Sequence, residues 1–533
     1  MTNTMQPIFI LPEDTKQTTG KDALRNNIAA AKAVAQAVRS TLGPKGMDKM
    51  IVDSAGDVTI TNDGVTILTE MQIEHPAAKM IVEIAKTQEE AVGDGTTTAV
   101  ILAGELLKKA EELLDQNIHP TVLAKGYRLA EAEAQRILQQ EAEAVTIDDE
   151  QLLQHIAITA MTGKGAEANK EKLAEIIVKA VRRVAEGTTV NSNNIKVEKQ
   201  IGESADKSEL IDGLVIDKEK VHSEMPNKVE NAKIALLDSP LEIKNTEIDA
   251  KIQITDPSQL NAFLDMEERT LRQMVEKIKD SGATVLFSQR GIDDLAQHFL
   301  AKAGILAARR VLKSDMEKLA QATGAKIVSN WKELTAADLG FAGLVREEKR
   351  GAEELLFIEK CRNPKAVTLL VKGGTEHVVE EIKRAVADAI GDLAAAIKEG
   401  KAVAGAGAVE IKIAKGLKKY AEKLTGREQL AAQAFAEAME VIPRALAENA
   451  GLDPLEVITQ LRSAQQKWPG INVFNGQIMD AWNAGVIEPL KVKTQAISSA
   501  AEVAEMIIRI DDVIVGGNKK QASNLPPPGI GMM

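Results

Sequence analysis

Apolar residues recur at every third or fourth position along much of the chain, which is the spacing of amphipathic helices. The first such stripe predicts a helix that begins near Asp22 and ends at the helix-breaking run Gly43-Pro44-Lys45-Gly46. Its apolar positions are Ile28, Ala31, Ala35, Val38 and Leu42. Similar stripes fill the chain up to about residue 185 and again from 375 to 464. We therefore expect two mainly helical regions.

Between residues 215 and 371 the pattern changes to short apolar runs that are typical of buried strands. Helical segments separate several of these runs, which predicts an α/β domain. The runs are 234–237, 284–287, 325–328 and 367–371. Earlier in the chain, apolar and polar residues alternate on both sides of Asp63-Gly64, a dipeptide typical of tight turns. A β-hairpin is expected there.

A further apolar stripe follows Asp256-Pro257, which has the form of an N-cap followed by proline at the first helical position. Its apolar positions are Leu260, Phe263, Leu264, Leu271, Met274, Val275 and Ile278. On the pattern alone this segment is interpreted as an ordinary core helix.

A length of 533 residues is too great for one ordinary core, so we expect roughly two to four domains. The chain has 66 Lys and Arg against 78 Asp and Glu, a net charge of −12, which argues against a broad basic surface for nucleic acid. Cys361 is the single cysteine, so no internal disulfide can form, as suits a reducing cytoplasm. Neither a membrane-spanning apolar run nor a secretory signal is present in the sequence, so a cytoplasmic location is expected.

The sharpest local motif is the loop Gly93-Asp94-Gly95 with the threonine run that follows it. Glycines allow close approach to a ligand, and a helix N-terminus is a ready phosphate site. Asp94 is a candidate Mg²⁺ ligand beside such phosphates. The plainer interpretation, a glycine turn with a threonine N-cap, is about equally well supported by the motif alone.

Two other glycine loops, at 42–46 and 405–408, resemble phosphate cradles, although each alone is more often a turn or a helix cap. The sequence contains no Walker-type P-loop, and the segment from Gly405 lacks the dinucleotide fingerprint.

Two carboxylates and the histidines are candidate catalytic groups or metal ligands. Asp63 is interpreted as a turn former, and Asp388, near the apolar face of a helix, is more often a solvated helix edge. No histidine has metal-ligand spacing with another histidine or with the cysteine, so zinc is not predicted, although spatial pairing is left open. The histidines are His75, His119, His155, His222, His298 and His377.

Ordered motifs along nearly the whole chain resemble those of the group II chaperonins, specifically the archaeal thermosome subunits. They lie at residues 6–11, 25–29, 41–50, 61–66, 92–98, 161–165, 449–454, 486–489, 492–496 and 509–514. The resemblance implies a multidomain fold of α and α/β type. It contains a mainly helical, ATP-binding equatorial domain (1–146 and 403–533), a small intermediate hinge domain (147–214 and 368–402) and an α/β apical substrate-binding domain (215–367). The stripe after Asp256 then falls in a helical protrusion at about 245–280 that serves as a built-in lid.

The same resemblance assigns site residues. Asp94 would bind Mg²⁺, while Asp63 and Asp388 would orient and activate the water that attacks ATP. Lys164, from the hinge domain, would reach the γ-phosphate. The ATP-binding residues implied are Leu42, Gly43, Pro44, Gly95, Thr96, Thr97, Thr98, Gly163, Lys164, Gly405, Ala406, Gly407, Asn472 and Glu488.

Two departures from the family pattern stand out. Ala406 replaces the middle residue of three consecutive glycines, and its methyl group disfavours a positive φ. The glycine- and methionine-rich tail is reduced to residues 529–533.

The function implied is that of an ATP-hydrolysing chaperonin that encloses non-native proteins, with identical or paralogous subunits in two stacked rings of eight or nine. No nucleic-acid or membrane partner is implied. The alternative is a holdase or ring scaffold that binds nucleotide without turnover; Ala406 favours it slightly, whereas Asp63, Asp94 and Asp388 argue against it. A metabolic kinase is a weaker third, because the chain has no Walker motif.

Overall fold

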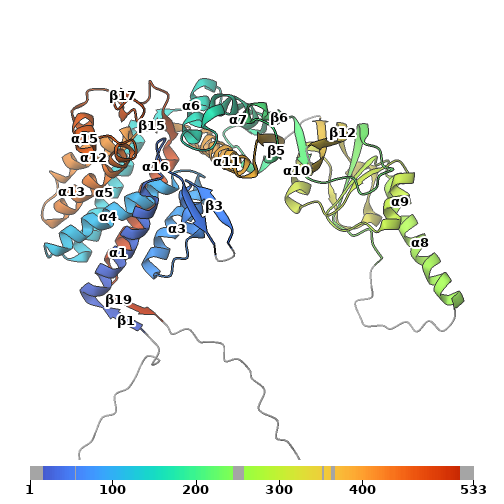
Figure 1. Ribbon diagram of the computed structural model, residues 1–533, viewed down its shortest axis with the longest axis horizontal. Coiled ribbons are helices and arrows are strands. Elements are labelled where there is room, and N and C mark those ends of the chain that lie inside the picture. Colours follow the sequence, from blue (N-terminus) through green and yellow to red (C-terminus); the bar gives the residue numbers. More distant parts are fainter. Residues whose placement is uncertain (1–15, 54–55, 244–256, 351–352, 362–365, 516–533) are drawn as a thin grey trace, which may run out of the picture.

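The computed structural model describes residues 16–53, 56–243, 257–350, 353–361 and 366–515. Helices dominate both ends of this chain and sheets dominate its middle (Figure 1). The two ends of the described chain meet, because β1 (Lys16–Thr19) pairs antiparallel with β19 (Asp512–Val515).

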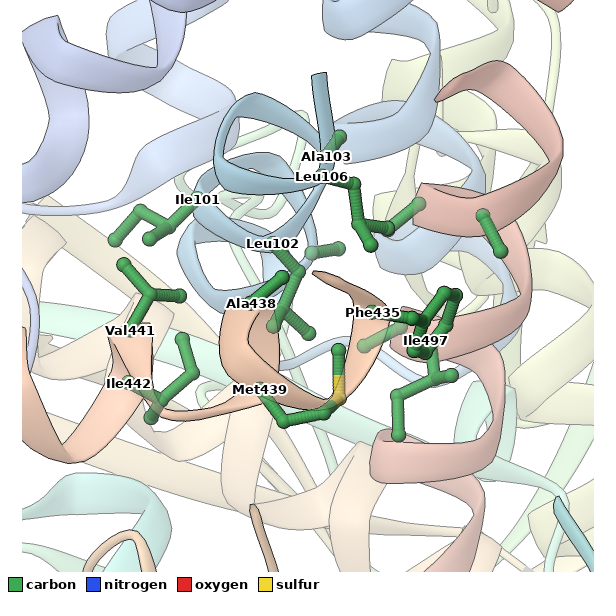
Figure 2. Packing of buried hydrophobic residues seen from close by; sticks show 14 of the residues in the cluster. Ile101, Leu102, Ala103, Leu106, Phe435, Ala438, Met439, Val441, Ile442 and Ile497 are labelled. Carbon is green, nitrogen blue, oxygen red and sulfur yellow. The ribbon is translucent and has the colours of Figure 1, made fainter. Parts of the chain in front are cut away.

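The largest hydrophobic core joins helices from the two ends of the chain. Figure 2 shows side chains of α4, α13, α14 and α16 converging in it. The apolar face predicted for the first helix is confirmed, since Ile28, Ala31, Ala35 and Val38 are buried, although the helix ends at Arg39. The contributing helices are α1 (Gly20–Arg39), α2 (Gly64–Glu70), α3 (Pro76–Ala91), α4 (Thr96–Asp115), α5 (Pro120–Glu141), α12 (Ala408–Ala421), α13 (Arg427–Met439), α14 (Val441–Asn449), α15 (Pro454–Ser463) and α16 (Leu490–Ile508).

A second core lies among three helices and a small sheet. The helices are α6 (Glu150–Met161), α7 (Lys170–Val184) and α11 (Glu376–Glu399). In the sheet, β14 (Val367–Gly373) runs parallel to β5 (Ile195–Ile201) and antiparallel to β6 (Glu209–Ile211). All seven residues of β14 are buried, so neither face of this strand is exposed to solvent.

The middle of the chain forms a seven-stranded sheet with helices on both faces, which confirms the α/β prediction. Met316 and Leu319 of α10 (Lys313–Thr323) cover one face, while α8 (Pro257–Asp280) and α9 (Asp294–Lys302) cover the other. The strand order is β10 (Leu306–Ala308), β9 (Val285–Ser288), β8 (Lys228–Leu237), β12 (Gly340–Arg350), β13 (Glu353–Cys361) and β7 (Gly213–Ile216), with β11 (Ile327–Val328) beside β8.

The second half of α8 is a core helix, because Leu271, Met274, Val275 and Ile278 are all buried. The predicted lid extends from about residue 245 to 280. Its first part, 245–256, and the side chains of Leu260, Phe263 and Leu264 lie outside the residues described.

The hairpin prediction at Asp63-Gly64 was wrong. Asp63 is the N-cap of α2, and its Oδ2 accepts hydrogen bonds from the backbone N–H and the hydroxyl of Thr66, at 2.8 and 2.6 Å. The hairpin in this region is instead formed by β2 (Lys49–Val52) and β3 (Val58–Thr61). Aspartate fits a turn and an N-cap equally well, and here the cap forms because the apolar Ile67 and Leu68 are buried on a helix.

The remaining strands are short and lie near the helical cores. Strand β15 (Lys401–Ala404) pairs antiparallel with both β18 (Ile487–Pro489) and β4 (Glu143–Ala144), and β16 (Pro469–Ile471) pairs with β17 (Ile478–Asp480). Within the described ranges, every helix is too short or too polar to cross a membrane.

Candidate nucleotide site

A cavity of about 430 Å³ lies at the N-terminal end of α4, between residues of the two helical cores. Stretches far apart in the sequence form its walls, including the three glycine loops and the end of α6. Gly405 and Asp388 are not in its lining, but each adjoins a lining residue: Gly405 precedes Ala406, and Asp388 contacts Lys164. The predicted residues that line it are Leu42, Gly43, Pro44, Asp63, Asp94, Gly95, Thr96, Thr97, Thr98, Gly163, Lys164, Ala406, Gly407, Asn472 and Glu488.

The loop before α4 lines the cavity, and a glycine with a positive φ and a buried glutamine fix its backbone. Gly95 is the N-cap with φ +79°, and a Cβ there would lie 2.7 Å from Val492 Cγ1. The buried Gln88 amide donates to the carbonyls of Asp94 and Val492, at 2.8 and 3.2 Å. Because Gly95 has no side chain and the N-terminal N–H groups of a helix lack intrahelical partners, this end of α4 can receive an anion.

The end of α6 meets the first glycine loop through backbone contact. Gly163 has φ +81°, and a Cβ on it would lie 2.6 Å from the Cα of Pro44. The carbonyl of Gly163 also accepts a hydrogen bond of 2.9 Å from the side-chain amide of Asn62. These contacts place the next residue, Lys164, at the cavity.

The ammonium of Lys164 joins two of the predicted carboxylates. Its Nζ lies 2.5 Å from Asp388 Oδ2 and 3.2 Å from Asp94 Oδ1. Burial alone would lower the pKa of Lys164, but the charges of Asp388 and Asp94 raise it well above the usual value. Lys164 therefore stays a cation that ties α11 to the α4 loop. The Asp388 side chain, only 15% exposed, is not the solvated helix edge that the sequence pattern favoured.

More negative charge faces this lysine than one ammonium can balance. Burial, with the charges of Asp388, Asp63 and Asp94, raises the pKa of Glu89 to about 8. Asp392, one helical turn after Asp388, is 1% exposed, and its Oδ1 has no hydrogen-bond partner among the described residues. Burial and the Asp94 charge raise the pKa of Asp392 well above its usual value. An additional cation at this place would satisfy these groups, and the oxygen ligands fit Mg²⁺.

The cavity lining also includes part of a second buried charge cluster. Lys493 Nζ, 5% exposed, lies 2.7 Å from Glu488 Oε2 and 2.9 Å from Glu410 Oε1. Burial raises the pKa of Glu488, and Lys493 opposes that effect. Gly405 leaves room for this cluster, because a Cβ there would lie 2.5 Å from Glu488 Oε1. The lysine thus keeps Glu488 in place at the cavity wall.

Sequence reasoning missed several residues of the site. The charged ones are Glu89, Asp392, Glu410 and Lys493, and the uncharged ones are Thr41, Asn62 and Gln88. A signal existed for Asp392, since it lies four positions after Asp388 and therefore on the same helix face. Signals also existed for Thr41, Asn62 and Lys493, which lie in the family-like motifs at 41–50, 61–66 and 492–496. Gln88, Glu89 and Glu410 come to the site only through the tertiary fold.

The departure at Ala406 is visible in the backbone. Ala406 has φ +54°, in the left-handed region, and Gly407 has φ +76°. The carbonyl of Ala406 accepts a hydrogen bond of 3.1 Å from Ile471 N–H, which fixes the loop. The alanine that departs from the family's glycine pattern therefore has the positive φ that its methyl group disfavours.

We expect Ala406→Gly to stabilise the protein by up to about 1.6 kcal/mol. A left-handed conformation costs an L-residue roughly 1–2 kcal/mol, and the freedom that glycine adds to the unfolded chain cancels about 0.4–1 kcal/mol of the gain. The midpoint of thermal unfolding measures the effect, with Ala408→Gly, at the start of α12, as a control that should destabilise. A lower midpoint for Ala406→Gly than for the wild type would show that the loop is not strained.

Comparison with known proteins agrees with this picture. The TCP-1/cpn60 chaperonin family matches residues 34–518. The chain is 60% identical to thermosome subunit beta of Methanothermobacter thermautotrophicus over 520 residues, which cover 97% of this chain and 96% of the relative. It is 60% identical to thermosome subunit beta of Archaeoglobus fulgidus, over 96% of this chain and 95% of the relative. It is 58% identical to thermosome subunit alpha of the same organism, over 95% of this chain and 94% of the relative.

Matches of this extent confirm the family that the sequence motifs indicated and the multidomain α and α/β fold expected of it. They do not depend on any one loop, because they run through both helical cores and the central sheet. The chain therefore belongs to the TCP-1/cpn60 chaperonin family and, with its thermosome relatives, to group II of the chaperonins.

Proposed function

We propose that this chain is a subunit of a double-ring chamber that encloses non-native proteins and closes with its own lid when ATP binds and is hydrolysed. As a chaperonin of the thermosome type, it is an ATP-dependent chaperone and an ATPase. The observation that best supports the fuller proposal is the cavity at α4, where Lys164 joins carboxylates from two different cores.

We propose the three domains at the boundaries expected from the sequence. The positions of the hydrophobic cores support them. The largest core draws on residues 28–138 and 403–508, and the second mainly on 145–195 and 367–402. The clusters on the two faces of the seven-stranded sheet draw on 214–366. The largest core would then belong to the equatorial domain, and the two clusters around the sheet would belong to the apical domain. The domain that contains the second core would act as the hinge.

In the proposed complex, the triphosphate of ATP lies at the N-terminus of α4. The threonines Thr96 to Thr98 and the N–H groups there would hold the phosphates, with Gly43 and Gly163 allowing close approach. Ala406, Gly407, Asn472 and Glu488 also line the cavity and would contact the nucleoside. Gly405 would act indirectly, by leaving space for Glu488.

Asp94 is the proposed Mg²⁺ ligand. The excess of carboxylates over lysines around it supports this assignment, as does Asp392 Oδ1, which has no hydrogen-bond partner among the described residues. When bound, Mg²⁺ would neutralise charge on the transferring phosphoryl group.

Hydrolysis would depend on how the chain's own groups share protons and charges. In the structure Lys164 contacts Asp388 directly. A γ-phosphate near Lys164 would compete for its ammonium, and Asp388 would then be free to accept a proton from the attacking water. Asp63 lines the same cavity and would help to orient that water. Because Asp388 belongs to α11 and Asp94 to the α4 loop, turnover would require the hinge domain to stay closed on the nucleotide.

We also propose that the subunits form two stacked rings of eight or nine, with identical or paralogous copies as partners. The thermosome relatives are named as alpha and beta subunits, which supports an assembly of related chains. A cytoplasmic location is proposed because Cys361, the single cysteine of the chain, is free and buried.

The lid is tested by replacing residues 245–265 with a short glycine–serine linker. This deletion spares Leu271, Met274, Val275 and Ile278, whose burial makes the second half of α8 necessary for the fold. ATP hydrolysis and ring assembly should be retained, whereas an ATP-trapped client should lose its protection from protease. The intact chain with ADP is the control for the open chamber. Full protection of the client by the deletion variant would refute a lid in this segment.

A further inference from the structure

We propose that His222, Glu224 and His298 form a binding site for one divalent transition metal ion, with Zn²⁺ as the best-fitting ion. The site would lie on the part of the molecule built around the seven-stranded sheet. None of its three residues lines the nucleotide cavity.

The three side chains are far apart in the sequence but adjacent in the fold. One potential ligand atom from each lies within 4.8 Å of the others. The two imidazole rings have centroids 5.8 Å apart and are tilted by 52°. His222 and Glu224 belong to the loop after β7, and His298 belongs to α9. Both histidines are half-buried and Glu224 is exposed, so an ion can enter from solvent.

The loop that presents His222 and Glu224 is anchored on β10. Val221 N–H donates to the Ala307 carbonyl at 2.9 Å, and Ala307 N–H donates to the sulfur of Met225 at 3.3 Å. Met225 is 2% exposed, and its N–H donates to the His222 carbonyl at 3.1 Å. The ligands on this side are therefore held before any metal arrives, which reduces the entropy cost of binding.

The second ligand-bearing element is equally constrained. On α9, Ala296 and Leu300 are fully buried on both sides of His298 in the sequence. The next residue, Phe299, carries the guanidinium of Arg272 over its ring at 5.1 Å, which joins α9 to α8. An ion at His298 would therefore fasten the 221–225 loop to the helix that supports the second half of α8.

The chemistry of the ligand set selects the metal. Two imidazoles and one carboxylate suit Zn²⁺, which commonly binds three such ligands and one water. Mg²⁺ and Ca²⁺ prefer sites made of oxygen atoms alone. Zinc bonds of about 2.0–2.2 Å require ligand atoms roughly 3.3 Å apart, so the groups must move closer on binding. The exposed Glu224 side chain has the freedom to make that adjustment.

The tautomer of His222 is compatible with metal binding. Its Nδ1 accepts a long hydrogen bond of 3.2 Å from Glu224 N–H, so Nδ1 carries the lone pair when the ring is neutral. A metal ion would exchange that weak bond for a coordinate bond, without removal of a proton from the ring.

The test uses the full-length chain, stripped with EDTA and then kept in excess Mg²⁺ so that its carboxylate sites are occupied. Titration calorimetry with Zn²⁺ should detect one equivalent per subunit. The variants His222→Gln, His298→Gln and Glu224→Gln should each weaken this binding by at least about tenfold. The control is His377→Gln. This substitution also removes one histidine, but His377 is exposed at the start of α11, away from the proposed site.

Basal ATP turnover should be unchanged in all four variants, which also shows that they fold. The glutamate variant changes only an exposed side chain, so it should fold even if a histidine variant does not. The proposal is overturned if the three site variants bind Zn²⁺ as the wild type does, or if His377→Gln loses the same equivalent.

Discussion

Asp388→Asn should bind ATP almost normally and hydrolyse it about a hundredfold more slowly, or worse. The asparagine keeps the shape of the side chain and an oxygen that can accept from Lys164, but it cannot accept a proton from water. The phosphate-binding groups at α4 do not depend on Asp388, so ATP affinity, measured by calorimetry, should change little. Turnover is measured by phosphate release in the steady state.

The matched control for this variant is Glu399→Gln. It lies on the same helix, α11, and also exchanges one carboxylate for an amide, but its side chain is exposed at the far end. It should hydrolyse ATP at the wild-type rate. If Asp388→Asn retained turnover within about twofold of the wild type, its carboxylate would not be the base, because such groups contribute at least about 10² in rate.

The pH dependence gives an independent measurement of the same residue. Burial, opposed by Lys164 and reinforced by Asp94, raises the pKa of Asp388 to about 7. Below that pH its carboxyl is protonated and cannot act as a base, so kcat/KM should fall as the pH decreases through about 7. An ordinary aspartate would retain activity down to about pH 4. The acidic limb should be absent from the residual activity of Asp388→Asn.

Asp94→Asn should abolish Mg²⁺-dependent hydrolysis, with a loss of at least about a hundredfold, because charge neutralisation is the main requirement of phosphoryl transfer. The fold should survive, since Gln88 holds the backbone carbonyl of Asp94 and not its carboxylate. Asp115→Asn, at the other end of α4, is the matched control, because the Asp115 carboxylate is exposed and is ion-paired with Arg25.

Two measurements distinguish a metal ligand from a structural residue at position 94. The Mg²⁺ concentration needed for half-maximal turnover should rise steeply in Asp94→Asn and stay unchanged in Asp115→Asn. The thermal midpoint should be similar in both variants. Turnover by Asp94→Asn with the wild-type Mg²⁺ dependence would contradict the assignment.

The local patterns of the sequence were enough to predict most helices and the α/β middle of the chain. The 3.6-residue period is a property of the chain itself, so the buried face of α1 could be predicted before any contact was known. The glycine loops were equally visible, and the structure places all three at or directly behind the cavity wall. Their role was ambiguous, because a glycine turn has the same sequence pattern whether it caps a helix or binds a ligand.

Only the tertiary structure decided which of two local meanings applies. Asp63 fits a hairpin turn and an N-cap, and burial of Ile67 and Leu68 selects the cap. Asp388 fits a solvated edge, but the segment after α6 brings Lys164 within 2.5 Å of it, which leaves the Asp388 side chain only 15% exposed. His222 and His298 show no ligand spacing along the chain, and they meet because β10 holds one loop beside α9. The sequence by itself determined the elements and the family, since these depend on short-range periodicity and ordered motifs. Which charged and metal-binding side chains meet depends on long-range packing, and no local sequence pattern encodes that packing.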